Sequence, residues 1–390
     1  MKRSVSVHLY VSERGVFVVK FNTPRKISDE KGIVMDKVLD VKNVLVIFGG
    51  CSPEYGVSLQ SAAAVIRNID RSKYLPVLVG ITQEGDWYHY DGDVKEIEND
   101  TWWKGDCCTR ALVSPDRSRH ELVVLDEDGN RYIKIDIALP ILHGKNGEDG
   151  SVQGYLSAAG IPVAGCKILA SALCMDKDRA HRMVGAAGVR VPRAVVVEDI
   201  NDMEIIDGFA DIVGFPLFVK PVKAGSSFGI TKVYEKNELC EAVKKAFEYD
   251  DSVIVEENID GFEVGCAVLG TDKLIVGEVD EIELSDGFFD FTEKYTLKTS
   301  RIHVPARISA ELSDAVKKTA QKIYRTLGCS GFARVDMFLT PDGEIVFNEV
   351  NTIPGFTEHS RYPGMMRAAG MEFGEVVDRI LEQAALQEKR

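Results

Sequence analysis

The charged residues of one predicted hairpin are the first sign of chemistry in this sequence. Two strands with alternating apolar residues, within 332–356, flank an Asp-Gly pair, which is typical of tight hairpin turns. With that pair at the centre of the turn, Asp336 faces Glu349 across the ribbon. By the same register, Arg334 faces Asn351. Because alternate strand residues share a face, all four side chains are predicted to project from one side.

These side chains are suited to a magnesium site. Two opposed carboxylates repel, and burying them without a cation is costly. Magnesium prefers oxygen ligands, commonly one or two carboxylates with phosphate and water, so we predict that Asp336, Glu349 and Asn351 bind metal. Arg334 would supply a fixed cation for developing negative charge. The alternative is a solvent-facing hairpin, although the polar, proline-containing loop that follows it is not typical of a plain edge.

A second segment, 218–233, combines a lysine with small polar residues. Lys220 ends an apolar strand, and a loop containing Ser226 and Ser227 follows it. Such a loop can close its N–H groups and hydroxyls over phosphates, with Lys220 as a point charge. The segment lacks the spacing of a Walker P-loop. A flexible hairpin turn is an equally good interpretation of this segment alone.

Further candidates lie in glycine-rich loops and at strand ends. HGKNGEDGSVQG (143–154) and FGGCSPEYG (48–56) each follow an apolar strand, where α/β domains commonly bind ligands, although ordinary helix-capping loops fit as well. Glu256 and Glu257 end one strand, and Glu263 lies in the next. These three carboxylates could bind a ribose or an adenine amino group, or could simply be surface caps.

Composition restricts the class of protein. The chain has 390 residues, a formal charge of -14 and 45% hydrophobic residues. This charge argues against a nucleic-acid partner, and no apolar run approaches the ~20 residues of a membrane span. Eight scattered cysteines without a C-x-x-C pair indicate reduced thiols in a cytoplasmic protein. The N-terminus lacks the apolar core of a secretory signal, and Met35, just before the first strong strand, is a candidate translation start.

The order of elements predicts a mixed α/β and α+β protein of three domains after an N-terminal extension with weak strand character (1–40). The domains are a parallel α/β domain (41–165), a central domain (166–260) and a C-terminal domain (261–390). A single helix is expected over 171–188.

Six separated motifs, in this order, resemble the D-alanine–D-alanine ligase family, which has the ATP-grasp fold, over about 43–385. They are HGKNGEDGSVQG, SALCMDKDRAH, KPVKAGSSFGITK, FDFTEKY, ARVDMF and NEVNTIPGFTEHSRYP. Within the family the chain looks most similar to vancomycin-resistance ligases that make D-alanyl-D-serine. It retains Lys294 and Tyr295, which the D-lactate branch lacks. It also carries Arg361 where housekeeping ligases tend to have an aliphatic residue.

The resemblance implies an ATP-dependent ligase that joins D-alanine to a second D-amino acid, with D-serine favoured, through an acyl phosphate. Such an enzyme would supply altered cell-wall precursors and glycopeptide resistance, and would be a homodimer. The alternatives are a D-alanine–D-alanine ligase of normal peptidoglycan synthesis and a catalytically impaired ATP-binding homologue.

Individual roles follow from the motifs. The resemblance implies that ATP is bound by two lysines, a serine and three glutamates: Lys177, Lys220, Ser227, Glu256, Glu257 and Glu263. Asp336, Glu349 and Asn351 become the ligands of two Mg²⁺ ions, with Mn²⁺ as an alternative. Five residues receive catalytic roles: Arg334 and Gly355 at the oxyanion, Ser226 and Tyr295 as a hydrogen-bonded pair, and His143 near the reacting groups. Lys294, Ser360 and Arg361 would bind the second amino acid beneath a lid, 286–298.

One departure from the family pattern concerns the first amino acid. The resemblance implies a carboxylate immediately before Val57-Ser58 that binds the ammonium group of the first D-alanine, and this chain has Gly56 there. Glu54, two residues earlier, is the predicted substitute.

Overall fold

The computed structural model describes residues 7–11, 17–21, 41–225, 228–284 and 300–387. Residues 1–39 form one unit and residues 40–390 another. In the first unit, β1 (Val7–Val11) pairs with β2 (Phe17–Phe21) in an antiparallel hairpin, so the extension has the strand structure expected of it. The predicted lid lies outside the described residues.

The second unit begins with a seven-stranded sheet built around β3 (Lys42–Gly49). This strand lies between β4 (Tyr74–Ile81) and β9 (Ile137–Pro140) and is parallel to both. Its residues from Val44 to Phe48 have no exposed surface, as expected for a strand covered on both faces. Alternate residues pack on α1 (Tyr55–Asn68) and on α3 (Ser151–Ala158), one helix on each face.

The expectation of a parallel sheet holds only for these three strands. The sheet continues beyond β4 through four antiparallel strands, β5 (Trp87–Tyr90), β6 (Cys108–Val113), β7 (Glu121–Val124) and β8 (Arg131–Lys134). Parallel neighbours need a long crossover, which α1 supplies between β3 and β4, whereas β4 and β5 are joined by a tight turn at Gly85. The link from β5 to β6 contains α2 (Val94–Glu98) and the 3-10 turn η1 (Trp102–Lys104).

The predicted helix over 171–188 is wrong, because it is two helices. α4 (Ile168–Met175) ends at Asp176, and α5 (Lys177–Ala186) begins after it. Asp176 has extended backbone, and its carboxylate accepts the backbone N–H of Arg179 at 3.0 Å. An aspartate in this position satisfies an N–H group at the start of a new helix, which interrupts the old one.

A four-stranded antiparallel sheet follows, in the order β10-β13-β11-β12. Two helices, α6 (Met203–Val213) and α7 (Leu239–Phe247), cover one face, and η2 (Lys236–Glu238) precedes α7. The strands are β10 (Ala194–Val197), β11 (Leu217–Pro221), β12 (Thr231–Val233) and β13 (Val253–Glu257). Val219 and Val255 point into this small core, so strand alternation places Lys220 and Glu256 on the opposite face.

The last sheet is antiparallel, in the order β16-β15-β14-β17-β18. Its strands are β14 (Phe262–Leu269), β15 (Ile275–Leu284), β16 (Ser300–His303), β17 (Phe332–Leu339) and β18 (Ile345–Asn351). α9 (Ala310–Thr326) packs on one face, whereas α10 (Arg361–Ala368) packs against β14 and β15. α11 (Phe373–Gln387) joins α1 in a shared core.

Two global properties complete the fold. Among the described residues, no helix is both long and apolar enough to cross a membrane. All eight cysteines are free, as expected, but Cys51, Cys107 and Cys240 are exposed and do not belong to the core. The domain boundaries near 165 and 260 remain predictions.

Candidate functional site

The hairpin of β17 and β18 carries the predicted metal ligands in the predicted register. Asp336 pairs with Glu349, and Arg334 pairs with Asn351. Nearer the turn the pairing is shifted by one residue, because a longer turn than expected connects the strands. A bulge at Asn348 adds one residue to β18 and restores the register at the site.

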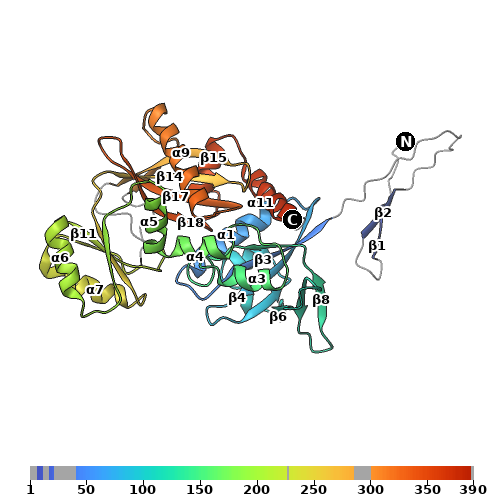
Figure 1. The fold of residues 1–390 in the computed structure, drawn as a ribbon. Helices are drawn as coiled ribbons and strands as arrows, with labels where there is room; N and C mark the ends of the chain where they lie inside the picture. Colours follow the sequence, from blue (N-terminus) through green and yellow to red (C-terminus); the bar gives the residue numbers. More distant parts are fainter. Residues whose placement is uncertain (1–6, 12–16, 22–40, 226–227, 285–299, 388–390) are drawn as a thin grey trace. The chain divides into compact units, whose positions relative to one another are not determined.

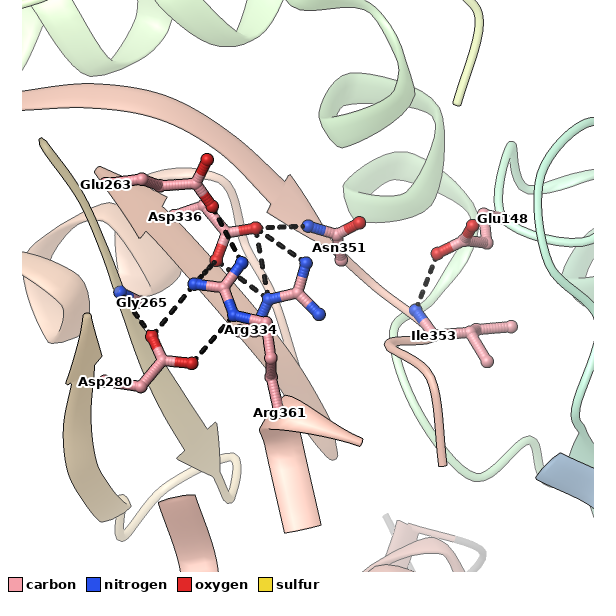
Figure 2. Close-up of polar contacts among 9 residues, drawn as sticks. All are labelled: Glu148, Glu263, Gly265, Asp280, Arg334, Asp336, Asn351, Ile353 and Arg361. Carbon is pink, nitrogen blue, oxygen red and sulfur yellow. Dashed lines mark hydrogen bonds and ion pairs between the residues drawn. The ribbon is translucent and has the colours of Figure 1, made fainter. Parts of the chain in front are cut away.

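Asp336 lies at the centre of a compact charged cluster (Figure 2). It is 1% exposed, and it accepts hydrogen bonds from Arg334 Nε at 2.8 Å and Nη2 at 2.7 Å. Asn351 Nδ2 donates to the same carboxylate at 2.9 Å, and Arg361 Nη2 lies 3.4 Å from it. The structure therefore brings together three of the four residues predicted from the hairpin.

Arg361 is tied into this cluster from α10. It binds Asp280 through Nε at 2.7 Å and Nη2 at 2.9 Å, and Glu263 through Nη1 at 2.7 Å. Burial disfavours its charge, but Asp280 and Asp336 hold the pKa of Arg361 well above its usual value. The guanidinium thus joins α10 to three strands of the sheet. A contact between Arg361 and the second amino acid, as predicted, would have to form without breaking these ion pairs.

Sequence reasoning missed Asp280. It is fully buried and also accepts the Gly265 N–H at 2.8 Å. A single acidic residue in a strand rich in alternating charges, GEVDEIEL, has no local signal that separates it from the other acidic residues of the strand. Only its distant partner Arg361 reveals its role.

The predicted nucleotide residues meet around a cavity of about 470 Å³ between the two antiparallel sheets. Its lining includes all three predicted glutamates, both lysines and one predicted metal ligand: Glu256, Glu257, Glu263, Lys177, Lys220 and Glu349. Lys220 Nζ binds Glu256 at 2.7 Å, and Lys177 Nζ donates to the Ala224 carbonyl at 2.6 Å. Five elements, α5, β11, β13, β14 and β18, contribute to this set.

The three glutamates differ in their surroundings. Glu256 is buried; burial opposes its charge, but Lys220 and His181 keep its pKa below the usual value. Glu257 is held by Arg193, whose Nε lies at 2.7 Å, and by Arg190 at 3.5 Å. Glu257 therefore has its charge already balanced at the cavity's edge, whereas Glu256 faces the lysines inside.

A second group of residues surrounds His143. This side chain is buried; its Nδ1 lies 2.8 Å from the Ile353 carbonyl, and its Nε2 lies 3.1 Å from Ser61 Oγ. Burial lowers the pKa of His143 to about 4, so the ring is neutral at physiological pH. Because a carbonyl only accepts, Nδ1 carries the hydrogen and Nε2 is the acceptor for Ser61. Ser61 Oγ in turn accepts the Phe356 N–H at 3.1 Å.

Glu148 is a second residue that sequence reasoning missed. Its Oε1 accepts the Ile353 N–H at 2.9 Å (Figure 2). Its Oε2 accepts the Gly144 N–H at 2.8 Å. Burial and the nearby Glu54 carboxylate raise its pKa to about 8. The side chain clamps two loops together, and its place inside the HGKNGEDG motif was the available signal.

Glu54 lies where three glycine-rich loops converge. It is 6% exposed, and a Cβ at Gly144 would overlap its carboxylate. A Cβ at Gly225 would lie 3.1 Å from Glu54 Oε2. By contrast, Gly56 is exposed, and a Cβ there would meet nothing within 4 Å. Glu54 is thus the buried carboxylate where these loops converge, whereas a side chain at position 56 would enter open space.

Gly355 and Ser360 occupy the loop after β18. A Cβ at Gly355 would lie 3.2 Å from Ser360 Oγ, and that hydroxyl is within 2.8 Å of Thr357 Oγ1. The loop is fixed by the contacts of Glu148 and Ser61 described above. Ser226, Ser227, Lys294 and Tyr295 fall outside the described residues, so their predicted roles remain predictions.

The donor chemistry of the hairpin fits magnesium. The described residues contain no group of three His, Cys, Asp or Glu side chains placed to hold a metal. The predicted set has only two carboxylates and Asn351, so its remaining ligands would be phosphate oxygens and water, as is usual for Mg²⁺. Glu349 lines the cavity beside the lysines, whereas Asp336 would share its oxygens with Arg334.

Two antiparallel sheets that enclose a cavity lined by lysines and carboxylates, next to a mixed seven-stranded sheet, define an ATP-grasp enzyme. Family models for the D-ala D-ala ligase N-terminus and C-terminus match residues 43–166 and 184–382, respectively. The chain therefore belongs to the D-alanine–D-alanine ligase family. The predicted enzyme class, an ATP-dependent carboxylate–amine ligase, is confirmed with it.

Individual relatives include several D-alanine ligases. The solved structure of VanG D-Ala:D-Ser ligase from Enterococcus faecalis is 56% identical, with a TM-score of 0.83, over 88% of this chain and 99% of its own. A putative D-alanine–D-lactate ligase from Streptomyces coelicolor is 47% identical over 87% of this chain and 96% of its own length. Vancomycin C-type resistance protein VanC1 from Enterococcus gallinarum is 43% identical over 88% and 98%, respectively.

Proposed function

We propose that this enzyme joins D-alanine to D-serine. The observation that carries the choice of D-serine is the similarity to the VanG D-Ala:D-Ser ligase over nearly the whole of both chains. In the proposed reaction, the carboxylate of the first D-alanine takes the terminal phosphoryl group of ATP. The amine of D-serine then attacks this acyl phosphate, so that an amide bond forms and phosphate leaves.

Bound ATP and Mg²⁺ would supply the phosphoryl group and neutralise its charge. Lys177 and Lys220, which both line the cavity, would bind the phosphates. Asp336, Glu349 and Asn351 would hold the metal ions. Their support is the opposed pair of carboxylates on β17 and β18.

Glu54 would bind the ammonium group of the first D-alanine. Its carboxylate is buried among the three loops near Gly144 and Gly225, where an ammonium group could pair with it. His143, neutral and bonded to Ser61 and Ile353, would shape the same pocket without adding charge. Arg334 and the Gly355 backbone would stabilise the oxyanion formed when the amine attacks.

Ser360 and Lys294 would hold the carboxylate of the second amino acid, with Ser226 and Tyr295 closing the site. An apolar pocket separates a methyl from a hydroxymethyl side chain by only about a hundredfold, so D-serine selection needs a polar partner. Arg361 would contribute to the selection of D-serine by orienting the carboxylates of Glu263 and Asp280.

Two alternatives remain testable. A D-alanine–D-alanine ligase would carry out the same reaction with ATP and would differ in its choice of the second amino acid. A catalytically impaired homologue was suggested by Gly56, but the burial of Glu54 weakens that reason.

Product analysis separates these functions. Purified enzyme with ATP and Mg²⁺ receives D-alanine alone, with D-serine, or with D-lactate, and ADP release and products are measured. D-alanyl-D-serine as the main product supports the proposal, whereas D-alanyl-D-alanine as the main product in the presence of both amino acids contradicts it. ATP binding without any product would identify the impaired homologue.

Three wider predictions depend on the same proposal. Expression in a susceptible host should raise vancomycin resistance if D-alanyl-D-serine reaches the cell-wall precursors. Light scattering tests the predicted homodimer, and cell fractionation tests the predicted cytoplasmic location.

A further inference from the structure

His181 is a buried side chain to which the sequence motifs assign no role. It lies on α5, one turn after Lys177, and is 5% exposed. Its ring meets Phe347 edge-on, with centroids 5.4 Å apart. This packing fixes the plane of the imidazole, so the direction of both nitrogens is defined.

One nitrogen anchors α5 to the strand that carries Glu349. His181 Nε2 lies 2.9 Å from the Asn348 carbonyl oxygen, and since a carbonyl only accepts, Nε2 carries the hydrogen. Asn348 is the bulged residue of β18, outside the regular pairing with β17. A bulge leaves backbone groups without ladder partners, and His181 satisfies this one.

The other nitrogen faces the carboxylate inside the nucleotide cavity. His181 Nδ1 lies 3.7 Å from Glu256 Oε1, and neither atom has a hydrogen-bond partner among the described residues. Glu256 Oε2 is bound by Lys220 at 2.7 Å. Lys220 therefore holds one oxygen of Glu256, and the imidazole of His181 lies next to the other oxygen.

We propose that His181 is a positioning residue. It fixes the position of Glu256 relative to β18, the bulged strand that carries Glu349. Nε2 donates a hydrogen bond to the Asn348 carbonyl of that strand, and the Nδ1 edge of the ring lies 3.7 Å from Glu256 Oε1. Because Lys177 lies on the same helix, this anchorage also sets the lysine that faces the cavity. The inference rests on the proposed function, since it assigns Glu256 to ATP and Glu349 to metal.

Substitutions can separate the two contacts. His181→Phe retains the packing on Phe347 but removes both nitrogens. His181→Gln retains a donor near the position of Nε2, toward Asn348. His89→Phe is the matched control, because His89 is also 5% exposed and its Nδ1 also lacks a hydrogen-bond partner among the described residues, but it lies on β5.

The dissociation constant of ATP, measured by calorimetry with Mg²⁺, is the primary readout. His181→Phe should raise it about tenfold, which corresponds to the loss of one hydrogen bond to a positioned group. The KM for D-alanine should stay within about twofold, and the Mg²⁺ concentration for half-maximal activity should rise. His181→Gln should recover only the part of the ATP affinity that depends on the contact with Asn348, and His89→Phe should leave the affinity unchanged.

A double-mutant cycle checks the link to Glu256. If His181 acts through that carboxylate, His181→Phe should weaken ATP binding by less than about threefold in a Glu256→Gln background. Equal effects in both backgrounds, unchanged ATP affinity in His181→Phe, or an equal rise in the KM for D-alanine would overturn the inference. Because ATP binding is measured without dipeptide synthesis, a wild-type enzyme that makes no dipeptide would refute the proposed function and leave this test intact.

Discussion

Glu148 accepts the backbone N–H of Ile353 at 2.9 Å, although the two residues are 205 positions apart. This bond joins the loop after β9 to the loop after β18, and so connects the seven-stranded sheet to the hairpin of β17 and β18. His143 makes a second connection between the same loops through the Ile353 carbonyl. The relative position of the predicted subsites therefore depends on the backbone of one residue, Ile353, which is bound through both its N–H and its carbonyl.

Glu148 should make the stability of the protein depend on pH. Its pKa in the folded state is raised to about 8, so folding favours the protonated acid. This contribution is fully present below the unfolded pKa and is lost as the pH rises through 8. Glu148→Gln removes it, so the unfolding free energy of wild type relative to this variant should fall between pH 6 and pH 8, by up to about 1.4 kcal/mol per pH unit.

Chemical denaturation of both proteins across this pH range is the measurement. A difference in unfolding free energy that stays constant, or grows in favour of wild type with rising pH, would contradict the raised pKa.

Asp336→Asn should reduce kcat by about a hundredfold or more, because it removes a charged ligand at the position where phosphoryl charge is neutralised. Its activity should also need more Mg²⁺. Asp342→Asn is the matched control, since Asp342 is an exposed residue of the same hairpin. Steady-state kinetics against Mg²⁺ concentration tests both; equal behaviour of the two variants would argue against a metal role for Asp336.

Arg361→Leu should destabilise the fold by about 3–5 kcal/mol, because it leaves the buried Asp280 carboxylate without its cation. Adding Asp280→Asn should recover part of this loss. Arg367→Leu, at an exposed position of the same helix, should change stability by less than about 0.5 kcal/mol. Thermal and urea unfolding measure all three, and a neutral Arg361→Leu would show that the ion pairs are not needed for stability.

Glu54→Gln should raise the KM for the first D-alanine about tenfold or more while the KM for ATP changes little, since a buried carboxylate is lost from the predicted ammonium site. Gly56→Glu should leave both values unchanged, because a side chain there enters open space. An improved KM for D-alanine in Gly56→Glu would instead restore position 56 as the missing ligand.

The sequence predicted the correct hairpin register at Asp336 and Glu349, although it predicted the wrong turn length. Alternation defines which residues share a face, because that is a property of the strand itself. The turn is longer than expected, and the bulge at Asn348 compensates for the shift. The local sequence of β18 does not reveal the bulge, because a regular strand with the same buried residues would have the same pattern.

The helix prediction failed at one position, where a side chain accepts a backbone hydrogen bond and so begins a new helix. Asp176 divides one apolar, helix-forming stretch into α4 and α5 by capping the second helix. The division matters for the site, because it makes Lys177 the first residue of α5, and places His181 one turn later.

By itself, the sequence determined the family, several residues that line the cavity between the two antiparallel sheets, and the two opposed carboxylates, since these depend on motifs and on strand periodicity. The tertiary structure decided which charges are buried together. Glu54 meets Glu148, and Asp280 meets Arg361, only because loops distant in the chain pack against each other. The free energy of a buried charge depends on its partners and its exclusion from water, and neither is a property of neighbours in sequence.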